Sequence, residues 1–188
     1  MVKDMIKNIL ITMTIIFATV NLNASPPKPN TFVPNRGLIP SVNLAKYMRA
    51  NIGRDIRGII IVWNREYDSP ATQIADLLIL FRDLSDTPKI PIQMLENKEF
   101  ELDKVLNTKK MLKVLRVFQT NLNQTYKTLF EYSSLIIGSK NGDIDKEYKR
   151  MLRDMQKVVN SYNSVAKVTN GQYKQKILPY YKLDYKTK

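Results

Sequence analysis

The most regular hydrophobic pattern of the sequence lies in its C-terminal half, in segments 103–137 and 143–170. In both, apolar or aromatic residues recur at alternating three- and four-residue steps, which places them on one face of an α-helix. The first set is Met111, Leu115, Phe118, Leu122, Tyr126, Leu129, Tyr132 or Ser133, and Ile136. The second set is Ile144, Tyr148, Met151, Met155, Val158, Tyr162, Val165 and Thr169. We therefore predict two long amphipathic helices.

The stretch between these helices, GSKNGD (138–143), reads as a tight turn. Gly138 can end the first helix in a left-handed conformation, and Asp143 can cap the start of the second. A connection this short predicts an antiparallel helical hairpin with knobs-into-holes packing.

A third helix is predicted over residues 41–67, with Ser41 as its N-cap. Apolar residues again follow three- and four-residue steps, at Ala45, Met48, Ile52, Ile56, Ile59 and Trp63. Gly53 and Gly58 weaken the helical interpretation. The run GIIIVW (58–63) is also compatible with a buried strand, because short apolar runs are ambiguous by periodicity.

Residues 70–102 are expected to form a short helix followed by a connector. Ser69 before Pro70 is typical of an N-cap with proline at the first helical position. Pro88 and Pro91 favour a non-helical connector over residues 85–102. The predicted fold is an all-α three-helix bundle, residues 41–172, in which the hairpin packs on the N-terminal helix and residues 70–102 form a small appendage.

The N-terminus has the pattern of an export signal. Lys3 and Lys7 precede an uncharged run, 9–20, and small residues end at Ala24. The run is shorter than the ~20 apolar residues of a membrane-spanning helix, so we predict a signal peptide cleaved after Ala24. Residues 25–40 hold five prolines and predict an extended leader. The expected location is the periplasm or the extracellular space.

Charge is distributed unevenly along the chain. The net charge is +13, and without residues 1–24 it is +12. Residues 25–102 carry a net +1 and residues 103–188 a net +11. Such asymmetry indicates attraction to a partner of opposite charge or a general affinity for polyanions.

The cations of the hairpin recur with helical spacing opposite the apolar faces, which predicts a basic stripe on each helix. The alternative is a solvated face of a lysine-rich protein. The tail, 173–188, interleaves tyrosines with lysines; it either docks on a partner or folds back over the end of the bundle, which we favour. The candidate surface for an anionic partner is Lys109, Lys113, Arg116, Lys127, Lys146, Arg150, Arg153, Lys157, Lys174, Lys176, Tyr180, Tyr181 and Lys182.

The composition excludes several kinds of site. The chain has no cysteine and no histidine, so thiolate or imidazole metal sites, cysteine nucleophiles and histidine-dependent triads are absent. No glycine-rich phosphate loop or nucleophile elbow is present, and the acidic residues are scattered. We expect no enzyme activity, no catalytic residue, no cofactor and no metal.

The sequence therefore favours an exported binding or assembly component that acts through protein–protein contacts, such as a secretion-system or pilus accessory subunit or an adhesin. We expect a protein partner, within an assembly of the cell envelope. The alternative is a binder of anionic lipid headgroups, lipopolysaccharide or another polyanion, with membrane contact at the periphery. Export and the lack of an arginine–aromatic motif disfavour nucleic acid. The layout is similar in architecture to minor pilus subunits of type IV secretion systems, although only GLIPSVN (37–43) is shared, loosely, and no family is assigned.

Overall fold

The protein is described by a computed structural model covering residues 41–96, 107–138, 141–174 and 176–184. The chain divides into two units, Met1–Asn35 and Arg36–Lys188, and every described residue belongs to the second. The predicted signal peptide and leader, residues 1–40, and the predicted start of the hairpin at residue 103 lie outside the described residues.

The N-terminal part of the bundle is a nearly continuous helical rod. It consists of α2 (Ser41–Met48), the π-helical segment η1 (Arg49–Gly53) and α3 (Arg54–Asn64). The rod ends where Arg65 turns to extended backbone. The predicted helix is confirmed up to Asn64, and the strand alternative for residues 58–63 is wrong. In such a rod Ile52, Ile56, Ile59 and Trp63 all face the core.

The next segment is more helical than predicted. The Ser69 side chain accepts a hydrogen bond from the Ala71 N–H and opens α4 (Pro70–Asp86), as the Ser-Pro signal predicted. A second helix, α5 (Lys89–Glu96), replaces part of the predicted connector. Pro91 is tolerated there because it lies in the first turn, where backbone N–H groups have no partner within the helix.

The predicted hairpin is confirmed. Its helices are α6 (Thr108–Ile136) and α7 (Ile144–Tyr173). The Asn107 side chain caps α6 by accepting from the Lys110 N–H, and Asp143 caps α7 by accepting from the Lys146 N–H. Gly138 has a φ of 72°, the left-handed conformation expected after α6.

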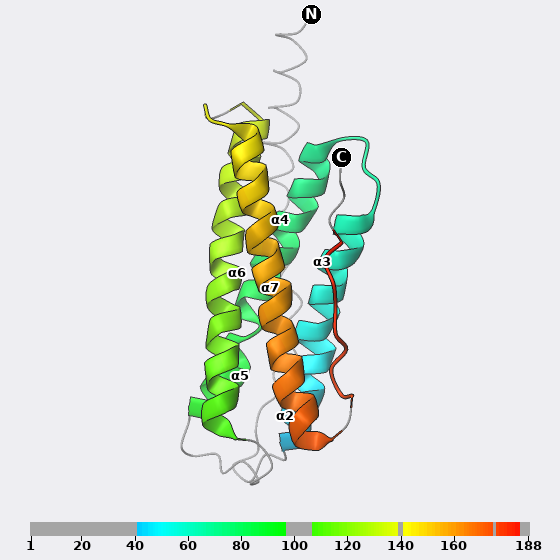
Figure 1. Ribbon diagram of the computed structural model, residues 1–188, viewed down its shortest axis with the longest axis vertical. Coiled ribbons are helices and arrows are strands. Elements are labelled where there is room, and N and C mark those ends of the chain that lie inside the picture. Colours follow the sequence, from blue (N-terminus) through cyan, green and yellow to red (C-terminus); the bar gives the residue numbers. More distant parts are fainter. Residues whose placement is uncertain (1–40, 97–106, 139–140, 175, 185–188) are drawn as a thin grey trace, which may run out of the picture. The chain divides into compact units, whose positions relative to one another are not determined.

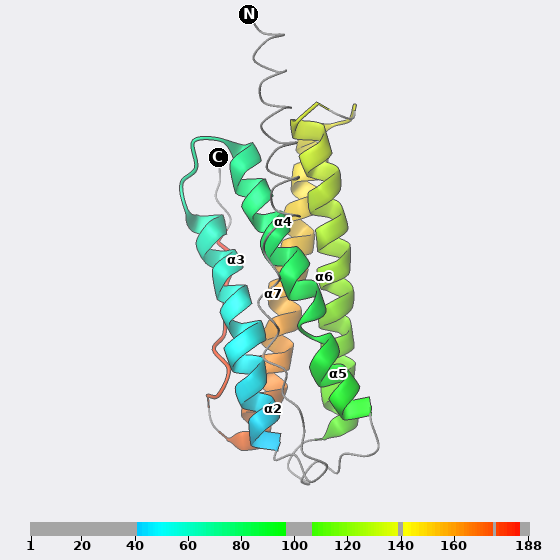
Figure 2. The same ribbon diagram turned by 180° about the vertical axis from the view of Figure 1, so that it is seen from behind.

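Four helices, α3, α4, α6 and α7, pack around one hydrophobic core, which confirms the all-α bundle (Figure 1). α7 packs along α6, α6 along α4, and α4 along α3 (Figure 2). Residues 70–86 are therefore a full member of the bundle and not a small appendage. Their apolar side chains are buried in its core: Ile74, Leu77, Phe81 and Leu84. The tail, residues 176–184, runs alongside α7 and α3 and occupies the fourth side of the bundle (Figure 1).

Candidate interaction surfaces

The tail is held in the groove between α7 and the η1–α3 rod. Two asparagines of α7 each bind one tail residue through its backbone. The Asn170 amide donates to the Leu178 carbonyl, and the Leu178 N–H donates to the Asn170 side-chain oxygen, both at 2.9 Å. Asn163 binds Tyr181 in the same way, at 2.8 and 3.0 Å. We call these two residues the asparagine clamp.

The spacing of the clamp fits an extended chain. Seven residues of α-helix separate the two asparagines, a rise of about 10.5 Å. Three residues separate Leu178 from Tyr181, which corresponds to about 9 Å in a polyproline-like conformation. The tail runs antiparallel to α7, since the earlier tail residue pairs with the later asparagine.

The N-terminal rod supplies the opposite wall of the groove. The Trp63 indole N–H donates to the Asp184 carbonyl at 2.9 Å, and the Tyr181 hydroxyl donates to the Gly53 carbonyl at 3.2 Å. Gly53 ends the π-helical segment, and a Cβ at this position would lie 3.2 Å from the Tyr162 hydroxyl. Glycine thus permits the close approach of α7 to the rod.

Apolar packing complements these hydrogen bonds. Leu178 and Leu183 are buried and join the core. The Tyr181 ring packs on Tyr162 with 5.6 Å between ring centroids. The predicted fold-back of the tail is therefore observed, but it lies along the side of the bundle and not over its end.

Sequence reasoning missed the asparagine clamp. The sequence signal that could have revealed it is a pair of asparagines seven residues apart at the edge of the apolar face of α7. In the structure Asn170 is buried. Side-chain amides carry both a donor and an acceptor, so they can replace a backbone strand as a hydrogen-bonding partner. The remaining tail candidates, Lys174, Lys176, Tyr180 and Lys182, are exposed.

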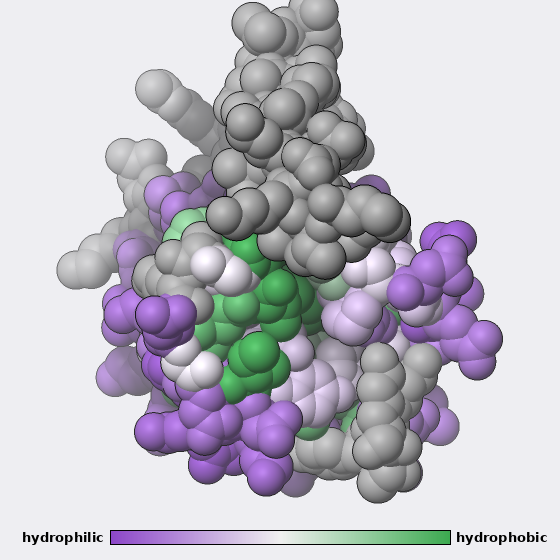
Figure 3. All heavy atoms as spheres, turned by 90° about the horizontal axis from the view of Figure 1, so that it is seen from above, coloured by the Kyte–Doolittle hydropathy of each residue, from purple (hydrophilic) through white to green (hydrophobic). Residues whose placement is uncertain are grey.

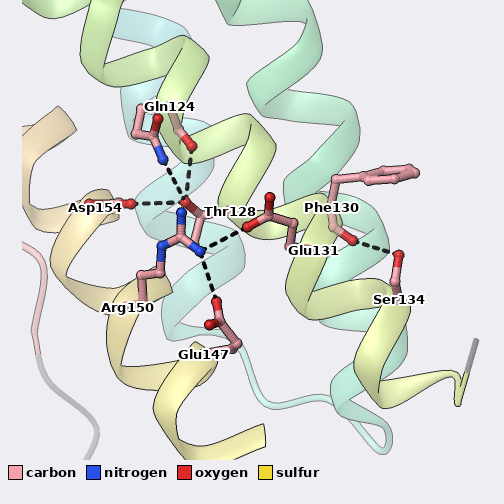
Figure 4. Close-up of polar contacts among 8 residues, drawn as sticks. All are labelled: Gln124, Thr128, Phe130, Glu131, Ser134, Glu147, Arg150 and Asp154. Atoms are coloured by element: carbon pink, nitrogen blue, oxygen red, sulfur yellow. Dashed lines mark hydrogen bonds and ion pairs between the residues drawn. The ribbon is translucent and has the colours of Figure 1, made fainter. Parts of the chain in front are cut away.

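A polar layer lies between α6 and α7 in the half of the hairpin nearer to the turn that joins them (Figure 4). The buried Thr128 hydroxyl donates to Asp154 at 2.8 Å, and Lys157 donates to the other carboxylate oxygen at 2.8 Å. Burial opposes ionisation of Asp154, but the hydrogen bonds from Lys157 and Thr128 and the charges of Lys157 and Arg150 lower its pKa below the ordinary value.

Arg150 lies beside the hairpin interface. Its guanidinium is half-buried and reaches Glu131 on α6 at 2.9 Å and Glu147 on its own helix at 3.2 Å (Figure 4). The helical spacing of the cations predicts the solvent face for Arg150, and this prediction is wrong. The difference arises because Arg150 adjoins the core residue Met151, about 100° around the helix, where charged residues of paired helices bridge to the partner.

The predicted basic stripes are consequently divided. Arg116, Arg150 and Lys157 bind carboxylates of the protein itself, with Arg116 reaching Glu96 at 2.6 Å. The other members are exposed: Lys109, Lys113, Lys127, Lys146 and Arg153. A shallow hollow on α7 beside Lys146 and Arg153 is also lined by Asp143 and Asp145, so both signs of charge meet there.

Large apolar side chains are exposed at the end of the bundle that carries the α6–α7 turn. Phe130, Ile137 and Ile144 are 55%, 42% and 48% exposed. Phe130 lies in the last two turns of α6, Ile137 follows that helix as its C-cap residue, and Ile144 begins α7. Phe130 points away from the polar layer (Figure 4), and apolar side chains gather near the centre of this end (Figure 3). We call these three residues the apolar end.

No protein-family model, no curated protein and no solved structure matches the chain. In the part of the chain that the structure describes, no group of three or more acidic side chains is placed to hold a metal ion. None of the helices within the same ranges combines the length with the apolar content that crossing a membrane requires.

Proposed function

We propose that this protein is an exported, non-enzymatic binding component that acts in a cell-envelope assembly through protein–protein contacts. The observation that supports this best is the apolar end. Three large apolar side chains are exposed within fifteen residues of the chain, on either side of one turn. Exposed apolar groups of this size, when clustered, are typical of surfaces that another protein covers.

The arrangement of the surrounding charges supports the same proposal. Several cations of the hairpin bind carboxylates of the protein itself, which reduces the charge free to attract an anionic surface. Phe130, in contrast, extends from α6 without joining the adjacent network (Figure 4).

Site-specific photocrosslinking in cells that express and export the chain tests this proposal. A photoreactive phenylalanine analogue at Phe130 or Ile137 should yield one discrete protein adduct, identifiable by mass spectrometry. Val117 is the matched control, since it lies on the same helix and is 50% exposed but is remote in sequence from the turn. Absence of adducts at Phe130 and Ile137, or an identical adduct at Val117, would contradict the proposal.

Export is tested by the intact mass of the protein recovered outside the cytoplasm. The mass of residues 25–188 is expected, because Leu22-Asn23-Ala24 after the uncharged run is the expected cleavage site. Recovery of the uncleaved chain from a membrane fraction would instead indicate an N-terminal anchor.

The exposed lysines support a second candidate, binding to anionic lipid surfaces. Lys109 and Lys113 start α6, and Lys127 follows further along the same helix. Changing all three to Gln should lower salt-sensitive retention on vesicles of mixed phosphatidylcholine and phosphatidylserine, because each lost contact reduces the electrostatic attraction. Changing Lys46, Lys89 and Lys167 to Gln is the control, with the same loss of charge at other exposed positions. Equal retention of both variants would mean that Lys109, Lys113 and Lys127 form only a solvated face and not a lipid-binding surface.

A further inference from the structure

The tail completes the bundle but is joined to it by a short connection. The groove that it fills lies between α7 and the η1–α3 rod, where Leu178 and Leu183 enter the core. Residues of the tail make six hydrogen bonds to this groove, four of them to the asparagine clamp. An extended segment must fill this groove to bury its apolar walls and pair its polar groups. The segment can belong to the same chain or to another molecule.

The connection is strained at its first residue. Lys174 follows α7 directly and adopts φ 50° and ψ 31°, the left-handed conformation. It is the single non-glycine residue with positive φ in the described parts of the chain. Side chains with a Cβ disfavour this conformation. Straightening the connection, so that α7 leads into the tail without a reversal, would release the strain.

The clamp recognises the main chain of the tail. The bonds of Asn163 and Asn170 reach only backbone N–H and C=O groups, and selectivity comes from the burial of Leu178 and Leu183 and the ring of Tyr181. An identical tail satisfies every one of these requirements. A second copy of the chain is therefore the partner whose chemistry fits the groove without any loss of contacts.

We propose that the groove between α7 and α3 accepts the tail of a second copy, so that two chains dimerise by exchanging residues 177–184. Reciprocal exchange gives a closed, symmetric dimer that keeps all six hydrogen bonds in each groove. This surface is separate from the apolar end, so the exchange stands or falls independently of the proposed partner binding.

Mixing experiments on the intact chain test the exchange. Unlabelled and ¹⁵N-labelled chains are mixed at high concentration and examined by native mass spectrometry. Mixed-mass dimers are expected in the wild type. The clamp bonds are present in the closed monomer and in the exchanged dimer alike, so they are tested by mixing two variants. Asn163→Ala/Asn170→Ala has a defective groove and an intact tail, whereas Leu178→Asp has an intact groove and a defective tail. Exchange between them restores one complete groove, so the mixture should contain at least about tenfold more dimer than either variant alone. Asn160→Ala is the control, since this asparagine of α7 is exposed and lies outside the clamp.

Changes in the connection provide a second measurement. Deleting residues 174–176 makes the tail too short to fold back, so this variant should be mainly dimeric in light scattering. Inserting Gly-Ser-Gly-Ser-Gly after Lys174 should give mainly monomer. Trp63 is the only tryptophan and is buried against the tail, so its blue-shifted emission should persist in both variants.

Two results would overturn the exchange. One is a wild type that forms no mixed dimers together with a deletion variant that stays monomeric with red-shifted Trp63 emission. The other is a mixture of Asn163→Ala/Asn170→Ala with Leu178→Asp that contains no more dimer than either variant alone, because exchange would have restored one complete groove.

Discussion

Asn170 and Leu178 exchange two hydrogen bonds of 2.9 Å, so a helix side chain takes the place of a neighbouring strand. Both residues are buried, and Leu178 is fully inaccessible. The backbone N–H and C=O of Leu178 thus have the Asn170 side chain as their common partner. Loss of that one side chain would remove both hydrogen bonds together.

We expect Asn170→Ala to destabilise the native state by about 2–4 kcal/mol, because each buried backbone group left without a partner costs about 1–3 kcal/mol. Urea unfolding followed by circular dichroism measures this loss, and Trp63 emission shows whether the tail has detached. Asn160→Ala should change stability by less than about 0.5 kcal/mol, as exposed substitutions generally do. Equal effects of the two variants would show that the clamp does not hold the tail.

The helices follow from local periodicity and were predicted for that reason. The apolar steps of α6 and α7, the turn at Gly138 and the caps at Ser69 and Asp143 all depend on residues close in sequence. α5 does not follow from the sequence pattern, because prolines predict a break in a helix, whereas Pro91 lies in the first turn, where a proline leaves the remaining hydrogen bonds intact.

The groove could not be predicted in the same way, because it depends on pairs distant in sequence. Trp63 binds Asp184, and Tyr181 binds Gly53, across more than a hundred residues. Periodicity identifies which face of a helix is buried but not which segment covers it. Arg150 was misplaced for a related reason, since its carboxylate partner Glu131 belongs to the other helix of the hairpin.

Two glycines offer a matched test of backbone conformation. Gly138 has positive φ, whereas Gly171 lies within α7, and a Cβ at either position would meet no atom within 4 Å. Gly138→Ala should destabilise by about 1–2 kcal/mol, because an L-residue disfavours the left-handed region. Gly171→Ala should stabilise by about 0.4–1 kcal/mol, since alanine restricts the unfolded chain. Thermal unfolding distinguishes the opposite signs, and a stabilising Gly138→Ala would contradict the assigned turn.

Tyr162 and Tyr181 form a second matched pair. The Tyr162 hydroxyl is buried and has no hydrogen-bond partner among the described residues, and its burial raises the pKa of the phenol. Tyr162→Phe should therefore be neutral or stabilising by up to about 1 kcal/mol, since it removes a desolvated hydroxyl. Tyr181→Phe loses the bond to Gly53 and should destabilise by about 1 kcal/mol. If Tyr162→Phe proved the more destabilising in urea unfolding, its hydroxyl would have a partner in the native state.

The polar layer of the hairpin should make stability depend on pH through Asp154. Its pKa is lowered in the native state, so the ionised carboxylate stabilises the protein above the unfolded pKa of about 3.9. This contribution disappears as the pH falls through the lower native value. Asp154→Asn should therefore destabilise the protein by about 1.5–3 kcal/mol at pH 7, the range for hydrogen bonds to charged groups.

As the pH falls below about 3.9 the difference between wild type and Asp154→Asn should shrink, because Asp154 of the unfolded chain binds a proton before the native carboxylate does. Urea unfolding at pH 7, 5 and 3 measures the trend. Asp83→Asn is the control, since Asp83 is exposed and, among the described residues, pairs with its neighbour Arg82 at the surface, where ion pairs contribute little. A difference for Asp154→Asn that stays constant across the three pH values would mean that its carboxylate is not held in the charged form by Thr128 and Lys157.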